Sequence, residues 1–600
     1  MPNPLFRERD IELVLYDVLH ADELTQLAVF ADHDRASFDM VIESARRFAR
    51  TTLHPAYKPI DETPPRLVDG GIVVHPRLKA LFPELAALGL VVAARPIEVG
   101  GQQLPRIVHT LATGYLMAGN LSAYGYIGLA AGAAHLLETF GSPALRATYM
   151  TPIYEGRWLG TMALTEPQAG SSLGDVSTRA TPTADGSYRI AGAKIFISGG
   201  DHDLTENIVH MVLARIDGAP AGTRGVSLFC VPKRRIAPSG GTALVDNDVA
   251  VAGMIHKIGW RGLPSLALAF GDHGDCHGWL VGEPHRGLAA MFQMMNEARI
   301  MVGMNGVATA SVAYHDALAY AQDRTQGRAV TAKDPSAPPI AIIEHADVRR
   351  MLLRQKAIVD GGLCLIARTA LYADLAEHST APANRARAQR LLDLLTPVAK
   401  SFPAEYGFEA NALAIQVHGG YGYTSEYPVE ALMRDQKLNS LHEGTTGIQG
   451  LDLLGRKVMA EGGAGLLALR EEIVSCAELA RAAGIDERLI VAVTAAMTTV
   501  EALTAGLGAK GLGGDVTGML LHSSDYLTLF GILVVAWQHL AMAAAARTAR
   551  AATEADSELL AGKVISADYW ISTELPRVAM LAELCRSGED SYLRIRPEQL

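Results

Sequence analysis

Apolar and polar residues follow two different periods along this chain. Up to about residue 160 the apolar positions have helical spacing, interrupted by the proline-rich stretch DETPPRLVDGG. Between about 161 and 285, short alternating or β-branched runs such as YRIAGAKIFISGG are separated by Gly, Asp and Pro turns, which is typical of antiparallel strands. From Leu288 onward apolar residues recur at i, i+3, i+4 and i+7, which is the spacing of one helix face.

The order of these segments predicts the fold class. Helices are followed by strands, then by long helices to about 455, and then by a last Ala/Leu-rich helical block. Because strands and helices do not alternate, the pattern disfavours a parallel βαβ sheet and predicts an α+β fold, with a β unit between helical ones.

Composition narrows the class of protein. The 600 residues are 49% hydrophobic and 20% charged, as in globular proteins. The formal net charge of −11 argues against a nucleic-acid partner, since phosphate binding needs a concentrated basic face. Charged residues stand where the apolar part of a signal peptide would lie, and the five cysteines form no CxxC pair. Neither disulfides nor a metal site is indicated, and we expect a reducing cytoplasmic location.

Two stretches match known patterns, a membrane span and a dinucleotide-binding motif, but the residues around them argue against both interpretations. Residues 527–546 are apolar and long enough to cross a membrane, but Gln538 and His539 lie among them. We therefore predict a buried core helix and at most peripheral membrane contact. The GLGAKG stretch at 506–511 matches GxGxxG, yet a helical segment precedes it where a strand is needed, so we expect a helix-to-helix loop and no phosphate site.

Three stretches carry candidate chemistry. ALTEPQAGSSLGD, residues 163–175, is a loop of small and hydroxyl residues whose backbone N–H groups can meet a polar ring or a phosphate. GAKIFISGG ends a strand with Phe196 and Ser198 on one face, which suits a stacked heterocycle, although a packed phenylalanine and a solvated serine explain it as well. LHEGTTGIQ places a lone carboxylate, Glu443, before a glycine and two threonines, and alone it is typical of a helix-capping loop.

Together these stretches resemble the acyl-CoA dehydrogenase family. LTEPQAGS is similar to its flavin loop, AKIFIS to its second flavin strand and LHEGTTGIQ to its catalytic loop. QVHGGYGYTSEYPVEALMRD resembles its C-terminal signature, and NEAR with RTQGR resembles two positions on its middle helices. The motifs stand in the family's order between residues 40 and 455.

The resemblance implies a particular arrangement of domains. An N-terminal helical domain, a middle antiparallel β-barrel or sandwich and a four-helix bundle are expected, with an additional C-terminal helical domain. The expected boundaries are 1–38 for an N-terminal extension, 39–160 for the helical domain, 161–285 for the β domain, 286–460 for the bundle and 461–600 for the last domain.

The resemblance also implies FAD as cofactor and an acyl-CoA as substrate. Ser198 would hydrogen-bond N5 of the flavin, and Arg324 and Gln326 would reach the FAD of a neighbouring subunit. The residues implied to contact FAD are Leu164, Thr165, Gly170, Ser171, Phe196, Ser198, Arg324, Gln326, Gln416, Gly419, Gly420, Thr445 and Gln449. Those implied to border the acyl-CoA are Asn296, Arg299 and Gly444.

Glu443 is implied to be the catalytic base. The α-hydrogen of a thioester is a weak acid, so its removal needs a base and stabilisation of the charge on the carbonyl oxygen. The β-carbon passes a hydride to flavin N5, which gives a trans-2-enoyl-CoA. Some members take the base from the position that Ala298 occupies here, and Glu297 lies about 100° round the helix from it. Both observations favour Glu443.

Some residues depart from the family's pattern. Ser172 stands where many members have Asp, Phe196 where many have Trp, and Ala431 where Arg or Lys is expected. These exchanges concern local geometry and leave the base in place. His442, beside the base, is expected to be a packed or solvated neighbour and not a second proton carrier.

The length of the chain resembles the long form of the family, the 3-methylmercaptopropionyl-CoA dehydrogenase type, and bacterial long-form enzymes for fatty acyl-CoAs. The extra C-terminal block can cover the face that shorter members use to form tetramers, so we expect a homodimer. Electron-transfer flavoprotein is the implied electron acceptor. Two alternatives remain open: an acyl-CoA oxidase that uses O2, and a non-catalytic protein that binds acyl-CoA or flavin.

Overall fold

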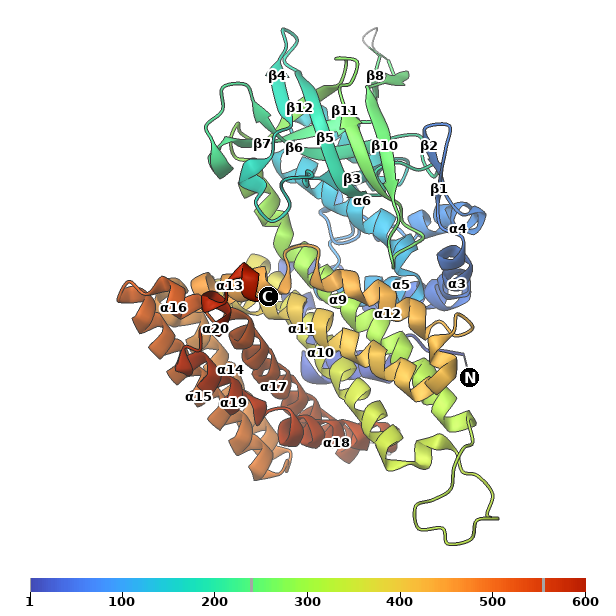
Figure 1. Ribbon diagram of the computed structural model, residues 1–600, viewed down its shortest axis with the longest axis vertical. Helices are drawn as coiled ribbons and strands as arrows, with labels where there is room; N and C mark the ends of the chain where they lie inside the picture. Colours follow the sequence, from blue (N-terminus) through green and yellow to red (C-terminus); the bar gives the residue numbers. More distant parts are fainter. Residues whose placement is uncertain (1, 238–240, 553–555) are drawn as a thin grey trace. The chain divides into compact units, whose positions relative to one another are not determined.

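The computed structural model describes residues 2–237, 241–552 and 556–600 (Figure 1). The chain forms two compact units, each assembled from separate pieces of sequence. The first, called here the sheet unit, comprises Asp39–Leu104 and Tyr115–Ala298. The second, called the bundle unit, comprises Met1–Phe38, Pro105–Gly114 and Arg299–Leu600. The N-terminal extension is therefore part of the bundle unit.

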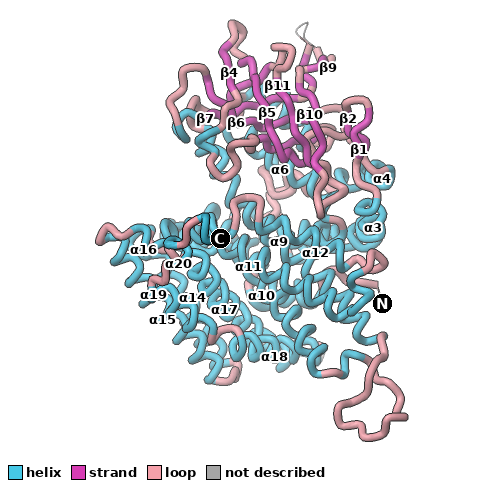
Figure 2. The backbone as a smooth tube through the Cα atoms, viewed as in Figure 1, coloured by secondary structure: helices cyan, strands magenta, loops and turns pink. Residues whose placement is uncertain are grey.

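An eight-stranded sheet organises the sheet unit (Figure 2). The strands are β3 (Leu159–Ala163), β4 (Arg179–Pro182), β5 (Tyr188–Ser198), β6 (Ile208–Ile216), β7 (Val226–Pro232), β10 (Val249–Ile255), β11 (Ser265–Phe270) and β12 (His277–Val281), in the order β10-β11-β5-β12-β7-β6-β3 with β4 beside β5 and β6. Most pairings are antiparallel, as the alternating pattern predicts. The β3–β6 and β4–β6 pairings are parallel, so the sheet is mixed.

The remaining strands form two short ladders. β1 (Arg66–Val68) pairs with β2 (Gly71–Val73), and β8 (Arg234–Ile236) pairs with β9 (Leu244–Asp246). In the main sheet, β7 is buried at every residue, because apolar groups cover both of its faces. The helix α6 (Leu121–Phe140) approaches β3 closely, since a Cβ added at Gly160 would lie 2.5 Å from the Cβ of Ala133.

Helices make up most of the rest of the chain. Those up to residue 160 are α1 (Glu8–Glu12), α2 (Arg35–Phe48), α3 (His54–Glu62), α4 (Pro76–Ala87), α5 (Arg106–Gly119), α6, α7 (Pro143–Leu145) and α8 (Thr151–Tyr154). The long helices after the sheet are α9 (Gly287–Asp323), α10 (Ala346–His378) and α11 (Pro382–His418), followed by α12 (Val429–Lys437) and α13 (Thr446–Asp452). The layout of helices, sheet and helices confirms the predicted α+β fold.

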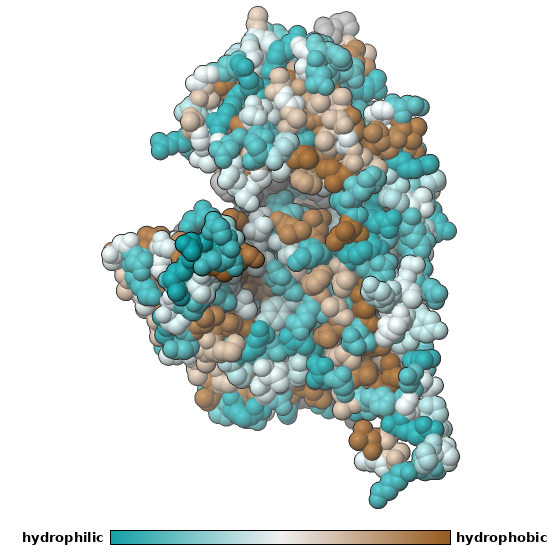
Figure 3. Space-filling model, in the orientation of Figure 1, coloured by the Kyte–Doolittle hydropathy of each residue, from teal (hydrophilic) through white to brown (hydrophobic). Residues whose placement is uncertain are grey.

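The C-terminal block is helical, as predicted. It contains α14 (Ala464–Ala482), α15 (Glu487–Leu512), α16 (Val516–Leu520), α17 (Ser523–Ala552), α18 (Ser557–Thr573), α19 (Arg577–Ser587) and α20 (Ser591–Arg594). Aromatic contacts join this block to α11, since the rings of Phe402 and Tyr406 both lie within 6 Å of the ring of Trp570 on α18, in edge and tilted arrangements. On the face of the molecule seen in Figure 3, hydrophobic and hydrophilic residues are interspersed.

The apolar helix α17 is the core of the C-terminal block. Two helices among the described residues are long and apolar enough to cross a membrane, and 89% of the apolar window of α17 is buried within the protein against 39% for α15. Gln538 and His539 are fully buried in α17. Gln538 accepts a hydrogen bond from Arg368 of α10 at 2.7 Å, and His539 bonds the Ala357 carbonyl at 3.0 Å. Each of the two side chains thus has a hydrogen-bond partner inside the protein, although Nδ1 of His539 has none among the described residues.

The glycines of GLGAKG lie at a different place from the one predicted. Gly506, Gly508 and Gly511 fall within the last turns of α15, not in a loop between helices. Helical spacing therefore continues through them, because a glycine in a helix costs only about 1 kcal/mol relative to alanine. A helix interior offers no free N–H groups for a phosphate.

A buried charge cluster joins the N-terminal segment to the helices of the bundle unit. The Lys563 side chain of α18 is 1% exposed, and its ammonium lies 2.7 Å from Asp10 and 2.9 Å from Asp360. The two carboxylates raise the pKa of Lys563 despite the opposing effect of burial. A buried ammonium group is tolerated only when carboxylates or other acceptors replace its hydration. The contacts of Lys563 with Asp10 and Asp360 therefore determine how the N-terminal segment, α10 and α18 pack together.

The close approach of α13 and α17 predicts an asymmetric response to alanine. A Cβ added at Gly450 would lie 2.6 Å from the Ser523 carbonyl oxygen, whereas one at Gly447 would meet only Thr445 Oγ1, at 3.9 Å. Gly450→Ala should lower the free energy of unfolding by about 1–3 kcal/mol, the usual cost of overpacking. The matched control Gly447→Ala, in the same helix, should be neutral or stabilising. Thermal and urea unfolding would measure both, and equal midpoints would contradict the packing.

Candidate functional site

The loop that contains Glu443 lies in the bundle unit, between α12 and α13. Glu443 has a φ of 53° and Gly444 a φ of 86°, so both residues adopt the left-handed conformation. This conformation is unfavourable for a residue with a side chain and persists only where neighbouring contacts impose it. Thr445 caps α13 by accepting a hydrogen bond from Ile448 N at 3.4 Å. The capping loop and the half-buried Glu443 carboxylate are therefore parts of one turn.

Three donors hold this turn. Gln449 is fully buried and its Nε2 donates to the carbonyls of Glu443 at 3.1 Å and Gly444 at 3.3 Å. Lys400 of α11 donates to the Gly444 carbonyl at 2.8 Å. Thr446 Oγ1 donates to the carboxylate of Glu405, also on α11. Lys400 and Glu405 were not predicted from the sequence.

The charges around Glu443 act in opposite directions. Burial raises the pKa of Glu443, and the nearby cations Arg299 and Lys400 lower it. Arg299 lies on α9, is 5% exposed and forms an ion pair with Asp452 at 2.8 Å, in which its Nη1 donates to Oδ2. Asp452 also pairs with Arg456 at 2.6 Å. The partly desolvated carboxyl thus has a higher proton affinity than a free glutamate, while two cations keep the ionised form accessible.

The neighbours of Glu443 and Arg299 in the sequence have separate surroundings. Burial lowers the pKa of His442 to about 3, so its imidazole is neutral near pH 7. Glu297 of α9 bonds His135 of α6 at 2.9 Å within the sheet unit. Ala298 has no titratable group. The side chain of Asn296, predicted to border the acyl-CoA, lies outside the described residues.

A second set of predicted residues lies at the other end of the bundle unit. Arg324 follows the last residue of α9 and donates to Gln326 Oε1 at 2.9 Å. Gln416 is exposed near the end of α11, and Cβ atoms added at Gly419 or Gly420 would meet nothing within 4 Å. These residues therefore form an open, polar surface.

The distance between the two sets follows from helix geometry. A Cβ at Gly303 would meet the Ala399 carbonyl, and one at Gly306 would meet that of Pro403, so α9 and α11 run in the same direction. At 1.5 Å per residue, Arg324 lies about 37 Å along α9 from Arg299. Thr445, Gln449 and Glu443 are thus grouped near the middle of α11, beside Lys400, and the Arg324 to Gly420 set lies at the C-terminal ends of α9 and α11.

The predicted flavin residues of the sheet unit surround a buried ion pair. Lys194 of β5 is fully buried, and its Nζ lies 2.8 Å from Glu166 Oε1 and 3.0 Å from the Leu164 carbonyl oxygen. Burial would raise the pKa of Glu166, but Lys194 and hydroxyl and amide donors from Ser177 and Thr178 lower it strongly. Burial lowers the pKa of Lys194 to about 8. Both residues belong to the two flavin-like motifs, but the sequence alone indicates no role for either of them.

This ion pair fixes the loop that follows β3. Because Leu164 and Glu166 are both bonded to β5, Thr165 between them is held in place, and its carbonyl accepts from Ile195 N at 2.9 Å. Gly170 and Ser171 are exposed in the continuing loop. A Cβ added at Gly170 would meet only Thr165 Cγ2, at 3.9 Å, so the loop backbone is open to a ligand.

Phe196 lies at an irregularity of β5. The pairing with β11 shifts between Leu266 and Leu268, and Phe196 has a φ of 61°. Such a bulge redirects the side chains that follow it. Phe196 is 60% exposed, and it flanks the buried Ile197 together with Ser198, so the two predicted residues share a face. An aromatic ring exposed to this extent offers a surface for stacking.

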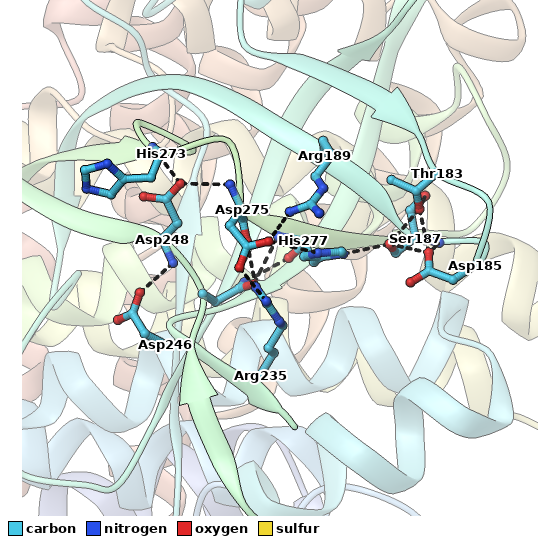
Figure 4. Close-up of polar contacts among 11 residues, drawn as sticks. Thr183, Asp185, Ser187, Arg189, Arg235, Asp246, Asp248, His273, Asp275 and His277 are labelled. Atoms are coloured by element: carbon cyan, nitrogen blue, oxygen red, sulfur yellow. Dashed lines mark hydrogen bonds and ion pairs between the residues drawn. The ribbon is translucent and has the colours of Figure 1, made fainter. Parts of the chain in front are cut away.

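Another polar cluster of the sheet unit contains none of the predicted site residues (Figure 4). Asp275 is paired with Arg189 and with Arg235, the latter at 2.6 Å, and hydrogen bonds from these guanidinium groups lower the pKa of Asp275. His277 Nδ1 lies 2.9 Å from Ser187 Oγ. These contacts join residues at or next to the ends of β5, β8 and β12. We interpret the cluster as one that stabilises the packing of these strand ends.

Family models match nearly the whole chain. Residues 36–157 match the acyl-CoA dehydrogenase N-terminal domain, 161–272 the middle domain and 285–459 the C-terminal domain. Residues 471–596 match a further domain described as acetyl-CoA dehydrogenase C-terminal like. The additional C-terminal domain predicted from the length of the chain is therefore a recognised module.

Relatives and solved structures agree with these matches. The chain is 38% identical to the 3-methylmercaptopropionyl-CoA dehydrogenase of Ruegeria pomeroyi, over 93% of this chain and 94% of the relative. It is 33% identical to a broad-specificity linear acyl-CoA dehydrogenase of Mycobacterium tuberculosis, over 98% of both chains. The structure of Caenorhabditis elegans ACDH-11 in complex with C11-CoA aligns with a TM-score of 0.75 and 18% identity, over 96% of this chain and 92% of that one. From these matches and the site geometry, we conclude that the chain belongs to the acyl-CoA dehydrogenase family of oxidoreductases.

Proposed function

We propose that this protein catalyses the FAD-dependent α,β-dehydrogenation of an acyl-CoA thioester, with Glu443 as the base. The observation that carries the proposal is the turn at Glu443 and Gly444, which presents a half-buried carboxyl between two buried cations in a chain of this family. A single carboxyl of raised proton affinity is suited to take one proton from a carbon acid.

Glu443 acts in its ionised form. Arg299 and Lys400 stabilise the carboxylate before the reaction, while burial favours its protonated form once the α-proton has been taken. The backbone N–H of Glu443 is held by the same turn and donates to the thioester oxygen, where negative charge develops. Gly444 is required by the turn itself, since its φ is 86° and a Cβ there would lie 2.7 Å from Gln449 Nε2.

The residues of the sheet unit fit a flavin. Phe196 and Ser198 offer an exposed ring and a hydroxyl on one face, and Gly170 with Ser171 offers open backbone after the fixed Thr165. FAD, when bound there, supplies the electron acceptor of the reaction. One solved structure, an acyl-CoA dehydrogenase of Bacillus anthracis complexed with FAD, shares this fold with a TM-score of 0.73 and 20% identity.

The substrate and the final electron acceptor are proposed from relatives. The two relatives named above act, by their names, on 3-methylmercaptopropionyl-CoA and on linear acyl-CoAs, and both span more than nine tenths of this chain. We propose an acyl-CoA of one of these two kinds as substrate. Electron-transfer flavoprotein is the proposed acceptor, in a cytoplasmic pathway of fatty-acid oxidation.

The separation of the two sets in the bundle unit supports a homodimer. Thr445 and Gln449 lie near Glu443, whereas Arg324 and Gln416 lie roughly 24–37 Å further along the helices. The two sets of one chain are thus too far apart to contact the same part of one cofactor. A second copy that supplies the Arg324 end to the cofactor of the first would complete both sites.

Anaerobic titration with acyl-CoAs tests the proposed function. Straight-chain and methylthio-substituted acyl-CoAs should bleach the oxidised-flavin absorbance of the holoprotein. Glu443→Gln should remain yellow and folded and should slow flavin reduction by about 10²–10⁴-fold, because the proton acceptor is lost. Near-normal bleaching by this variant would remove Glu443 as the base, and no bleaching of the wild type by any acyl-CoA would favour a binding protein. Peroxide formed in air during turnover would favour the oxidase.

The pH dependence of flavin reduction should have an acid limb. Glu443 must be deprotonated to act, and burial raises its pKa above the ordinary value of about 4.3. The rate constant of flavin reduction should therefore rise with pH, with a midpoint above the usual range of a glutamate. Stopped-flow absorbance between roughly pH 4 and pH 8 would measure this midpoint. A rate that stays constant down to the ordinary range would contradict a desolvated base.

Mixing two inactive variants tests the shared site. Glu443→Gln and Arg324→Ala disable different ends of the bundle unit, so in a mixed dimer one site carries both changes and the other carries neither. Refolding or co-expressing the two variants in equal amounts should restore about a quarter of the wild-type sites. Each variant mixed with itself is the control. Activity that stays at the level of the single variants would contradict a site built by two copies, and light scattering would distinguish a dimer from a tetramer.

A further inference from the structure

Lys400 is a lysine without exposed surface in the middle of a core helix. It lies on α11 between Pro397 and Pro403, and its relative exposure is 0%. Lysines are seldom fully buried, because the loss of hydration of an ammonium group is costly unless a partner replaces the water. A fully buried lysine therefore needs a contact that offsets the free energy of its desolvation.

The contact of Lys400 is with the catalytic turn. Its Nζ donates to the Gly444 carbonyl at 2.8 Å, and this acceptor is a peptide oxygen, not a carboxylate. Gln449 donates to the same carbonyl at 3.3 Å. Two donors on one carbonyl, one from α11 and one from α13, fix the orientation of the peptide that follows Gly444. That peptide is adjacent to Glu443, whose left-handed backbone needs an external restraint.

The charge of Lys400 also acts on Glu443. The groups that face Lys400 are the carboxylates Glu405 and Glu443, which attract it, and Arg299, which repels it. Burial lowers the pKa of Lys400 to about 8, so below that pH it remains a cation. Facing Glu443, in turn, are Arg299 and Lys400, both of which favour its ionised form. His442 is neutral in this range and adds no charge.

The position of Lys400 differs from that of Arg299 in one respect. Arg299 is already paired with Asp452 at 2.8 Å, so much of its charge is compensated. Lys400 donates its hydrogen bond to a carbonyl, and its charge acts on two carboxylates, Glu405 and Glu443. The hydrogen bond and the charge come from the same atom, and both converge on the turn.

We propose that Lys400 is a positioning residue for the dehydrogenation, which anchors the Gly444 carbonyl, holds Glu443 in its left-handed turn and places a positive charge beside its carboxyl. The inference rests on the proposed function, because it concerns the base of that reaction. Lys400 is not expected to touch the substrate or the cofactor, and it acts through Glu443.

Amide hydrogen exchange on the holoprotein tests the anchoring without any substrate. Lys400→Met removes the donor and the charge while keeping the length and apolar stem of the side chain. Exchange in the peptide spanning residues 441–449 should become at least about tenfold faster, because the loss of one charge-assisted hydrogen bond increases local opening. The control is Lys457→Met, the same change at a lysine whose ammonium lies 3.0 Å from Asp393. It should leave the 441–449 peptide as in the wild type.

The pH profile of flavin reduction tests the charge. Without the cation the carboxylate of Glu443 is less stabilised, so its pKa rises and the acid limb of the profile moves to higher pH. Lys400→Met should shift this limb upward and lower the limiting rate by at least about tenfold, with little change in the KM for the acyl-CoA. Lys457→Met should leave the limb in place.

The outcomes separate this inference from the proposed function. Faster exchange at 441–449 together with an upward shift of the acid limb supports the role of Lys400. Unchanged exchange, or an acid limb that stays at the wild-type pH, overturns it. If Lys400→Met does not fold, Lys400→Gln removes the charge and keeps a polar group, and the same two measurements decide. If the wild type fails to reduce its flavin with any acyl-CoA, the proposed function fails while the exchange experiment still tests the anchoring.

Discussion

The carbonyl of Gly444 is the acceptor on which the turn of the proposed base, Glu443, depends. Lys400 and Gln449 donate to it, and Gln449 also donates to the carbonyl of Glu443. Without these bonds the left-handed backbone of Glu443 would relax, because a residue with a side chain gains energy by leaving that conformation. The carboxyl would then lose its fixed position relative to Arg299 and Lys400, the two cations that favour its ionised form. The geometry of the proposed base is thus set by its main chain.

A hydrogen bond from a buried lysine to a loop carbonyl occurs in both units. In the sheet unit, the buried Lys194 donates to the Leu164 carbonyl at 3.0 Å, and in the bundle unit the buried Lys400 donates to the Gly444 carbonyl at 2.8 Å. Each lysine holds a loop that carries predicted site residues, and burial lowers the pKa of each to about 8. Lys194 has the further partner Glu166, which makes that loop an ion-paired structure. In both units, a buried lysine thus bonds the backbone of a loop that carries proposed ligand-binding residues.

The C-terminal block packs against α13, the helix that follows Glu443. Gly450 of α13 meets the backbone of Ser523 at the start of α17, and Phe402 and Tyr406 of α11 lie against Trp570 of α18. Both α11 and α13 supply donors to the Glu443 turn. The block therefore packs against the two helices that hold the Glu443 turn. The apolar helix α17 forms the core of the block that makes these contacts.

The sequence by itself determined the fold class, the order of the helical and β segments and the motifs that carry the resemblance to the family. These features are local: periodicity and short motifs depend on neighbours in the chain, so they can be read from it. The burial of α17 was also predictable, because Gln538 and His539 require partners inside a protein. The parallel pairing of β3 with β6 was not predicted, and the GLGAKG glycines proved to lie inside α15.

Only the tertiary structure decided how the site is held. Lys400 precedes Gly444 by 44 residues and Lys194 follows Glu166 by 28, and nothing in either motif shows that such side chains meet. The left-handed backbone of Glu443, the bulge at Phe196 and the partner of Arg299 likewise depend on contacts between distant segments. The physical reason is that a hydrogen bond or a charge acts over a few ångströms in space, whatever the separation along the chain.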